Sequence, residues 1–327
     1  MTSVVIWLNK ENDQKVLWGL ADTRITNSSS DGSANRILDT YPKIFELPIK
    51  VSADVARLRY SRVHSYGIAF AGSTLLASAT KEIVTFLCSN LSLNNYLNFE
   101  EPINAEKALM YSLQHANEYN SFLRDKLPAL SEFVETTKNV LDQVMGSYIK
   151  NQPNAQLNGL EFCLFGYCLQ LKKFCAYTLT CRMFVDRDEN NNQPFNNYSI
   201  NTDTKVFDEN SDQLDFILLG DKKEQIRDFI EEKKQELEKS RGYQYWRSPC
   251  YVIDDILEGD YLRTIGSSAQ LLKVNEQDAQ CVGISTKNTE MNYYGFNLLK
   301  FRDEVNTMQG FRNYGFTPNT LNLGFSD

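Results

Sequence analysis

Two stretches near the start of the chain decide the fold: Ser3-Val-Val-Ile-Trp-Leu8 and Val16-Leu-Trp-Gly-Leu-Ala-Asp-Thr-Arg24. Both are rich in aliphatic and aromatic residues, and the polar segment 9–15 separates them. Two β-rich runs joined by a short polar connection predict an antiparallel hairpin. We expect its first strand to begin at Thr2, directly after the initiator Met1.

Thr2 is the first candidate catalytic residue. Aminopeptidases that remove an initiator methionine act when the next side chain is small, and threonine qualifies. Removal of Met1 would leave a free α-amine and a hydroxyl on the same residue. These two groups are the base and the nucleophile of an N-terminal threonine hydrolase.

Three further segments follow in a fixed order: Gly19-Leu-Ala-Asp22-Thr-Arg24-Ile-Thr26, Pro42-Lys43-Ile-Phe45 and Tyr66-Gly-Ile-Ala-Phe-Ala-Gly72-Ser73. An aspartate ends the second predicted strand, a lysine begins the next, and a strand of small residues ends at a glycine before a helix. Together with Thr2, this order resembles the β-subunit family of the proteasome and the HslV-type peptidases. The resemblance covers about the first ninety residues and becomes patchy beyond them.

The resemblance implies a catalytic set of Thr2, Asp22, Lys43 and Gly72. Thr2 Oγ would attack a peptide or amide carbonyl, with the α-amine as the base. Lys43 would stabilise the negative charge that develops on the oxygen, and Asp22 would keep Lys43 charged and oriented. The Gly72 N–H would donate to the oxyanion. The partners implied are a peptide or protein substrate, copies of the same chain in a homo-oligomer, and an unfoldase.

The chain departs from the family pattern at two places. Asp221, after Gly220, stands where the family has a serine that supports the N-terminal amine. Two interpretations are open: Asp221 replaces that serine as an anionic anchor, or it indicates that the site is lost. Ser267 is the second residue expected to support the amine. It lies in a segment where the family has an aspartate and this chain has Arg263.

Size and charge limit the function classes. With 327 residues and 42% hydrophobic content, the chain can bury a large core, and no linker divides it. We expect one domain over 1–327, with insertions near 93–158 and 186–201 and an extension after Tyr293. The net charge of −8 argues against nucleic acid and against an anionic membrane surface. No apolar run is long enough to span a bilayer, and a cytoplasmic location is expected.

Histidine and cysteine usage narrows the chemistry. The two histidines, His64 and His115, have no nucleophile elbow to serve, and both are expected to be structural or surface residues. The seven cysteines lack paired metal-binding spacing and are expected to be buried as small hydrophobes. No metal and no cofactor is expected.

The order of predicted elements fits an α+β fold. Strands are expected at 44–49, 66–71, 160–165, 173–180, 215–220, 262–274 and 281–285. Helices are expected after Ser73, with Leu75, Ile83, Phe86 and Leu87 on the buried face, from about Asn104 with an interruption at Pro128, and over 222–241. The Asn-rich segment 186–201 is expected to be a surface loop. With the resemblance, these elements predict a four-layer αββα sandwich of the N-terminal nucleophile (Ntn) hydrolase type.

Three functions are compatible with the sequence. The first is a threonine peptidase or amidase that uses Thr2. The second is a non-catalytic subunit of the same fold that acts in assembly or binding. The third is a hydrolase of small amides on the same scaffold.

Overall fold

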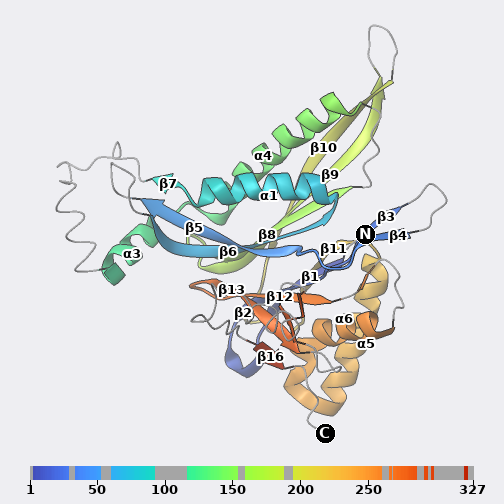
Figure 1. Cartoon of the computed structure of the whole chain (residues 1–327). Helices are drawn as coiled ribbons and strands as arrows, with labels where there is room; N and C mark the ends of the chain where they lie inside the picture. Colours follow the sequence, from blue (N-terminus) through green and yellow to red (C-terminus); the bar gives the residue numbers. More distant parts are fainter. Residues whose placement is uncertain are drawn as a thin grey trace, which may run out of the picture.

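The computed structural model describes residues 3–28, 34–52, 60–92, 116–153, 159–187, 194–259, 265–266, 268–285, 291–293, 296–297 and 320–322. Within these ranges the protein is a mixed α/β structure built on two large, curled sheets (Figure 1). Helices of the described residues cover the outer faces of these sheets. None of those helices is long and apolar enough to cross a membrane.

The first sheet contains the predicted N-terminal hairpin. Its strand order is β11-β1-β2-β12-β13-β14-β15, and β16 pairs with β13. The bounds are β1 Ser3–Asn9, β2 Val16–Asp22, β11 Phe216–Gly220, β12 Ala269–Val274, β13 Ala279–Ser285, β14 Met291–Tyr293, β15 Phe296–Asn297 and β16 Thr320–Asn322. The 3-10 turn η1, Glu11–Asp13, lies in the connection between β1 and β2. The antiparallel pairing of β1 with β2 confirms the hairpin.

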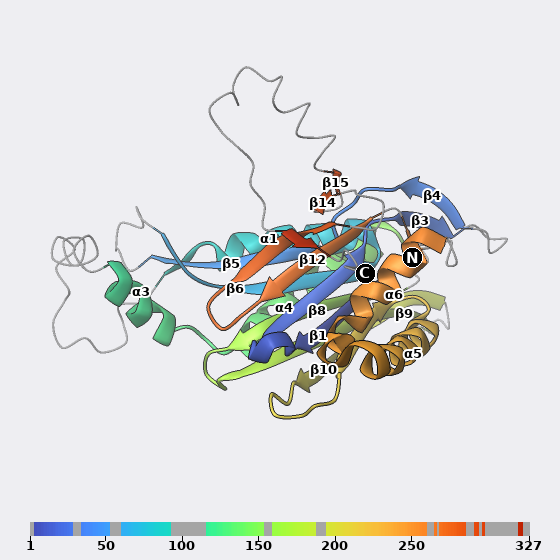
Figure 2. The same ribbon diagram turned by 90° about the horizontal axis from the view of Figure 1, so that it is seen from below.

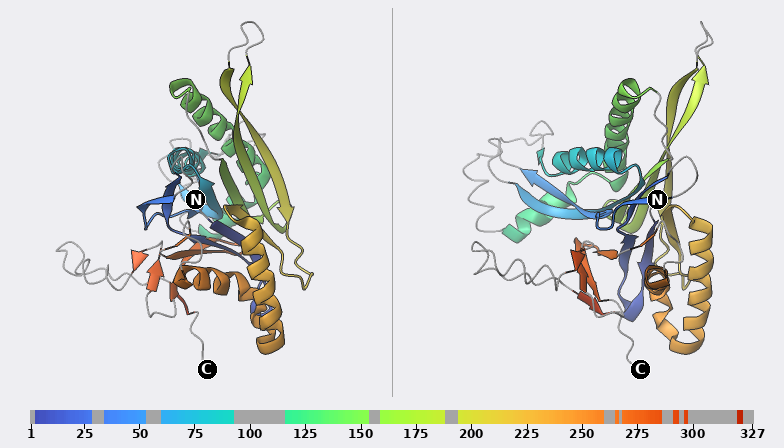
Figure 3. Two further views of the ribbon diagram at one scale, coloured as in Figure 1. Left: turned by 90° about the vertical axis from the view of Figure 1, so that its right-hand side faces the viewer. Right: turned by 45° about the vertical axis from the view of Figure 1, so that its right-hand side comes forward.

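The second sheet has the order β10-β9-β8-β6-β5-β7. Its strands are β5 Ile44–Ser52, β6 Ser61–Gly72, β7 Leu91–Ser92, β8 Leu160–Cys168, β9 Lys173–Arg187 and β10 Pro194–Val206. A small separate ribbon pairs β3, Ile25–Ser28, with β4, Ala34–Leu38. The β9–β10 pair extends beyond the rest of its sheet (Figures 1 and 3).

Helices pack on the face of each sheet that points away from the other sheet (Figures 2 and 3). Helices α1, Thr74–Cys88, and α4, Leu130–Asn151, share a core with the second sheet, which α3, Ala116–Asp125, also joins. Helices α5, Lys223–Arg241, and α6, Ser248–Gly259, share another core with the first sheet. The 3-10 segment η2, Gly242–Arg247, links α5 to α6.

Strand β1 shows why the opening run of apolar residues is continuous. All seven of its residues are buried. Val4 and Ile6 belong to the core between the two sheets, whereas Val5 and Trp7 belong to the core beneath α5 and α6. Because successive side chains of a strand point to opposite faces, a strand covered on both faces must be apolar at every position.

Phe165 of β8 packs between the two sheets. Its ring fills space that a Cβ atom at Gly19 of β2 or at Gly67 of β6 would occupy. Gly19 belongs to the first sheet and Gly67 to the second, so the absence of both side chains lets one aromatic ring sit between the sheets. Overlap in such a packed interior is relieved only by moving the ring or the backbone.

Two sequence expectations are wrong. Segment 186–201 contains much of β10, which pairs with β9 from Pro194 to Val206, and is therefore not a loop over its described residues. The strand lacks apolar alternation because it lies at the edge of the sheet, and its second half, residues 201–206, is largely exposed. The buried face of α1 is also different: it consists of Leu76, Ala77, Thr80, Val84 and Cys88.

The expected face of α1 is instead exposed. Leu75 is 71% exposed and Phe86 is 67% exposed, and Ile83 and Leu87 are exposed as well. The helix is apolar on two sides, so helical spacing is satisfied by either set of residues. Only the contacts with β5, β6 and α4 decide which set faces inward.

Other expectations are confirmed. Strands β5, β6, β8, β9 and β11 and helix α5 lie where the sequence places them, and Pro128 separates α3 from α4. All seven cysteines are buried and none forms a disulfide. Burial raises the pKa of Cys88, Cys163 and Cys250 to about 12. His115 lies outside the described residues.

We expect Gly67→Ala to lower the free energy of unfolding by about 1–3 kcal/mol, because its methyl group would overlap the Phe165 ring. Gly146→Ala is the matched control, since Gly146 lies inside α4 with room for a Cβ beside Tyr198. The control should be neutral or stabilising by about 0.5–1 kcal/mol. Urea denaturation measures both changes, and equal effects of the two substitutions would contradict this view of the packing.

Candidate active site

Asp22 lies at the centre of a buried polar cluster where β2 ends. Its side chain is fully buried, and Lys43, directly before β5, is 2% exposed. Lys43 Nζ lies 3.1 Å from both Oδ1 and Oδ2 of Asp22. The pair therefore joins the first sheet to the second, and it brings together two of the residues expected in the catalytic set.

Backbone amides complete the surroundings of the Asp22 carboxylate. Ser3 N donates to Oδ1 over 2.9 Å, and Arg24 N donates to Oδ2 over 3.1 Å. The Gly266 amide lies 3.5 Å from Oδ2. A carboxylate that accepts several N–H bonds and faces an ammonium group is well satisfied in spite of its burial.

Lys43 donates a third hydrogen bond, to the Arg24 carbonyl oxygen over 2.5 Å. Its three N–H donors thus meet the two oxygens of Asp22 and this carbonyl. Burial lowers the pKa of Lys43, the Asp22 charge and hydrogen bond oppose that shift, and the nearby Arg24 charge adds to it. The position of Lys43 is fixed from the main chain as well, since Lys43 N donates to Gln270 Oε1 over 2.6 Å.

Gly72 ends the neighbouring strand β6. The pairing of β5 with β6 places Ile44 opposite Ala69, and Phe70 N donates to the Lys43 carbonyl oxygen over 3.1 Å. Gly72 therefore lies two residues beyond Phe70, which contacts Lys43 directly. Its φ is +104°, a region that favours glycine, and a Cβ there would overlap the Gly159 carbonyl oxygen.

The residues expected to support the N-terminal amine are only partly described. Thr2 and Ser267 lie outside the described residues, as does Arg263. Asp221 is half-buried directly after Gly220, and Gly220 pairs in register with Ser3. The end of β11 lies beside the start of β1, and Asp221 comes directly after that end.

Sequence reasoning missed three residues of this region. Glu161 of β8 accepts a hydrogen bond from Gly220 N over 2.7 Å, and Lys223 Nζ lies 2.5 Å from its other oxygen. Arg24 is buried, lies 3.1 Å from Asp39 and fills the space beside Gly266. The third is Gln270, whose side-chain oxygen accepts a hydrogen bond from the Lys43 amide.

A signal for two of the missed residues exists in the sequence. Glu161 and Gln270 are polar residues inside apolar strands, in Leu160-Glu-Phe-Cys-Leu-Phe165 and Ala269-Gln-Leu-Leu272. A polar side chain in a strand buried on both faces needs a partner in the opposite layer. For Glu161 the partner is the Gly220 amide of the first sheet. For Gln270 the partner is the Lys43 amide, directly before β5 of the second sheet.

His64 does not belong to this site. It is buried in β6, and its ring nitrogens lie 3.1 Å from the Gln277 carbonyl oxygen and 3.2 Å from that of Tyr167. Burial lowers its pKa, which the two carbonyl contacts partly oppose. The expectation of a structural role is in keeping with these contacts. Among the described residues, no group of three His, Cys, Asp or Glu side chains could hold a metal ion.

Comparison with known proteins gives no family assignment. No protein-family model matches the sequence, and no curated protein matches it. Similar solved structures include the helical assembly of the Anbu complex from Pseudomonas aeruginosa, which is 10% identical with a TM-score of 0.44, covering 97% of this chain and 98% of that one. Two Anbu structures from Hyphomicrobium sp. strain MC1 are also similar, and one of them is a Gly-1 mutant.

The two Hyphomicrobium structures have TM-scores of 0.41, for the mutant, and 0.38, with 13% and 12% identity. Each covers 97% of this chain and is itself covered to 99%. The expected membership of the proteasome β-subunit and HslV family is therefore wrong. No model of that family matches the chain, and the similar solved structures named above are Anbu proteins, a distinct family. The short motifs that carried the resemblance are too few to separate related families.

The Asp22–Lys43 pair should behave as one energetic unit. We expect Asp22→Asn and Lys43→Met each to lower the free energy of unfolding by about 3–5 kcal/mol, because each leaves a buried group without its partner. The double variant should lose much less than the sum. Denaturant titration of the double-mutant cycle measures the coupling, with Lys15→Met at the more exposed Lys15–Glu209 pair as control, expected below about 1 kcal/mol. Strictly additive losses would contradict the coupling.

Glu161 should hold the end of β11 against the second sheet. We expect Glu161→Ala to lower the free energy of unfolding by about 1–3 kcal/mol and to speed hydrogen exchange of the Gly220 amide, which loses its acceptor. Lys223→Met is the control, since it removes the ion pair but keeps the amide bond. Faster exchange at Gly220 in the control as well would show that the ion pair, and not the amide bond, holds this strand end.

Proposed function

We propose that this protein is an N-terminal nucleophile hydrolase of the threonine type, acting on peptide or other amide bonds through Thr2 after removal of Met1. The observation that carries the proposal is the dual role of the Asp22 carboxylate. It binds the Lys43 ammonium and also the Ser3 amide, and the Ser3 nitrogen is bonded covalently to residue 2. A buried cation is thus tied to the residue that would bear the nucleophile.

The proposed fold is the four-layer αββα sandwich of such hydrolases. Its support is the order of cores: one core between α1, α4 and the second sheet, one between the sheets, and one between the first sheet and α5 and α6. In this arrangement the start of β1 lies between the ends of β2 and β11. We propose a single domain over 1–327.

The proposed reaction begins with attack of Thr2 Oγ on the substrate carbonyl carbon. The hydroxyl proton passes to the α-amine of Thr2, directly or through a water molecule, and a free α-amine with a pKa of about 8 suits that transfer near neutral pH. The Lys43 charge stabilises negative charge on Oγ, and the Gly72 N–H is the proposed donor to the oxyanion. The leaving amine takes the proton, and water then hydrolyses the ester on Thr2.

Asp221 and Ser267 are the proposed supports of the α-amine. A carboxylate beside the amine would stabilise its protonated form and raise its pKa. The register of Ser3 with Gly220 supports Asp221 in this role, because it brings the turn after β11 to the start of β1. Glu161 is the proposed positioning residue for that turn.

One observation favours a second function, that of a non-catalytic assembly or binding subunit. The three donors of Lys43 already meet Asp22 and the Arg24 carbonyl oxygen, so a hydroxyl would have to displace one of these contacts or be stabilised by the charge at a distance.

We also propose that the protein forms a homo-oligomer. Its support is the exposed apolar side of α1, which includes Leu75 and Phe86.

Variants at Thr2 test the catalytic proposal. We expect Thr2→Ala to abolish hydrolysis of a fluorogenic peptide-amide library without a change in melting temperature, whereas Thr2→Ser should keep part of the rate because it retains the hydroxyl and the amine. Hydrolysis by Thr2→Ala at the wild-type rate would exclude Thr2 as the nucleophile. No hydrolysis by a wild-type protein shown to start at Thr2 would favour the non-catalytic subunit.

A further inference from the structure

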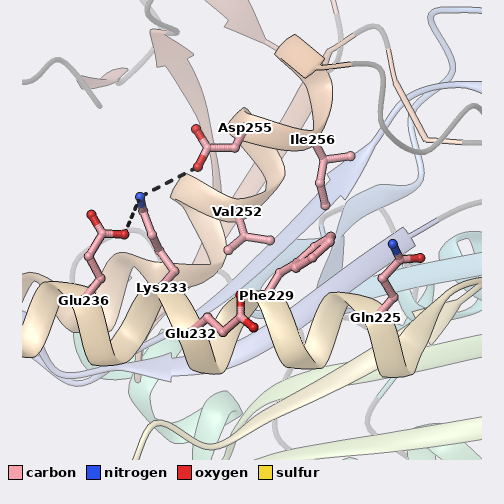
Figure 4. Close-up of a pocket in the computed structure, with 8 residues that line it drawn as sticks. All are labelled: Gln225, Phe229, Glu232, Lys233, Glu236, Val252, Asp255 and Ile256. Atoms are coloured by element: carbon pink, nitrogen blue, oxygen red, sulfur yellow. Dashed lines mark hydrogen bonds and ion pairs between the residues drawn. The ribbon is translucent and has the colours of Figure 1, made fainter.

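A groove of about 610 Å³ lies between α5 and α6, on the outer side of the first sheet (Figure 4). Phe229 from α5 and Val252 and Ile256 from α6 provide its apolar lining. Val252 and Ile256 are buried, and Phe229 is partly buried, so these side chains form a floor and not a loose surface patch. The α5–α6 layer is far in the sequence from Asp22 and Lys43, and the groove uses none of the proposed catalytic residues.

Acidic groups predominate on the rim of this groove. Among the described residues that line it, three are acidic, Glu232, Glu236 and Asp255, and one is basic, Lys233, so the formal charge of this lining is −2. Lys233 Nζ lies 3.0 Å from Glu236 and 3.8 Å from Asp255, so it spans from α5 to α6 (Figure 4). Within the described part of the chain, Glu232 forms no ion pair.

Two ion pairs of α5 lie within the helix and outside the groove lining. Arg227 pairs with Glu224, and Lys234 pairs with Glu231, each three residues apart. The described residues that line the groove carry a net negative charge, which comes from both helices. A cationic partner is therefore attracted electrostatically to this groove, and an anionic surface is repelled.

We propose that this groove binds a short amphipathic helix of a partner protein, with apolar side chains on one face flanked by Lys or Arg. The lining residues of α5 run from Gln225 to Glu236. At 1.5 Å per residue that length is about 16 Å, or about three helical turns. The apolar side chains of the partner helix contact Phe229, Val252 and Ile256, and its cations contact Glu232, Glu236 and Asp255, which is the helix-in-groove mode of recognition.

The test uses three labelled synthetic peptides of about 14 residues, long enough for about four helical turns. The first has Leu on one face and Lys on its flanks, the second has Glu in place of Lys, and the third has Ser in place of Leu. Fluorescence anisotropy with the full-length protein measures their binding. We expect saturable binding of the Leu/Lys peptide and at least about tenfold weaker binding of the other two.

Paired protein variants locate the site. The double variant Glu232→Gln/Glu236→Gln should weaken binding of the Leu/Lys peptide by about tenfold. Glu224→Gln/Glu238→Gln is the matched control on the same helix, with an equal change in net charge outside the groove lining, and should change binding by less than about twofold. Circular dichroism checks that both variants fold.

Three results would overturn the proposal. The first is the absence of saturable binding of the Leu/Lys peptide. The second is equal binding of the Ser/Lys peptide, which would show attraction to the net charge alone. The third is equal weakening by the two double variants, which would place the contact outside the groove.

Discussion

A single buried carboxylate, that of Asp22, organises the end of the molecule where the two sheets meet. It stands at the end of β2 and accepts bonds from the ammonium group of Lys43 and from the amide of Ser3. Because the charge is fully buried, every one of its neighbours must be held in place for the folded state to be stable. Through Asp22, the first described residue, Ser3, is thereby linked to Lys43, which directly precedes a strand of the opposite sheet.

The same physical demand shapes the rest of this region. Polar groups that lie between apolar layers require partners across the gap, and each partner fixes one more segment. The Gln270 side chain of β12 accepts a hydrogen bond from the Lys43 amide, and the Glu161 side chain of β8 accepts one from the Gly220 amide. These bonds link the two sheets where β12 meets the start of β5 and where β8 meets the end of β11. Elsewhere between the sheets, an apolar core includes Phe165.

The parts of the fold that the sequence predicts well are those with a strong local pattern. The N-terminal hairpin, the strand of small residues before α1, and the charged helix α5 have periodicity that permits one interpretation. The inward face of α1 could not be predicted in this way, since Leu75 and Leu76 begin two apolar stripes of similar quality. The edge strand β10 was missed because its Asn-rich sequence reflects exposure, and its structure depends on pairing with β9.

The candidate site shows the same division. Asp22, Lys43 and Gly72 were predicted from their order along the chain and their places at strand ends, and the structure brings the first two into direct contact and Gly72 close in register. Glu161, Arg24 and Gln270 could not be assigned, because their roles depend on contacts between segments far apart in the sequence. The family was assigned wrongly, because a few short motifs over about ninety residues did not suffice to identify it.

The central claim is that residue 2 carries a free α-amine next to its hydroxyl, since both proposed groups of the reaction reside there. Intact-mass spectrometry of the native protein, with sequencing of its N-terminal peptide, tests this most directly. We expect a mass lower than that of the full translated chain by one methionine residue and an unmodified N-terminal Thr2. A retained Met1, or a blocked amine on Thr2, in protein that hydrolyses amides would contradict it.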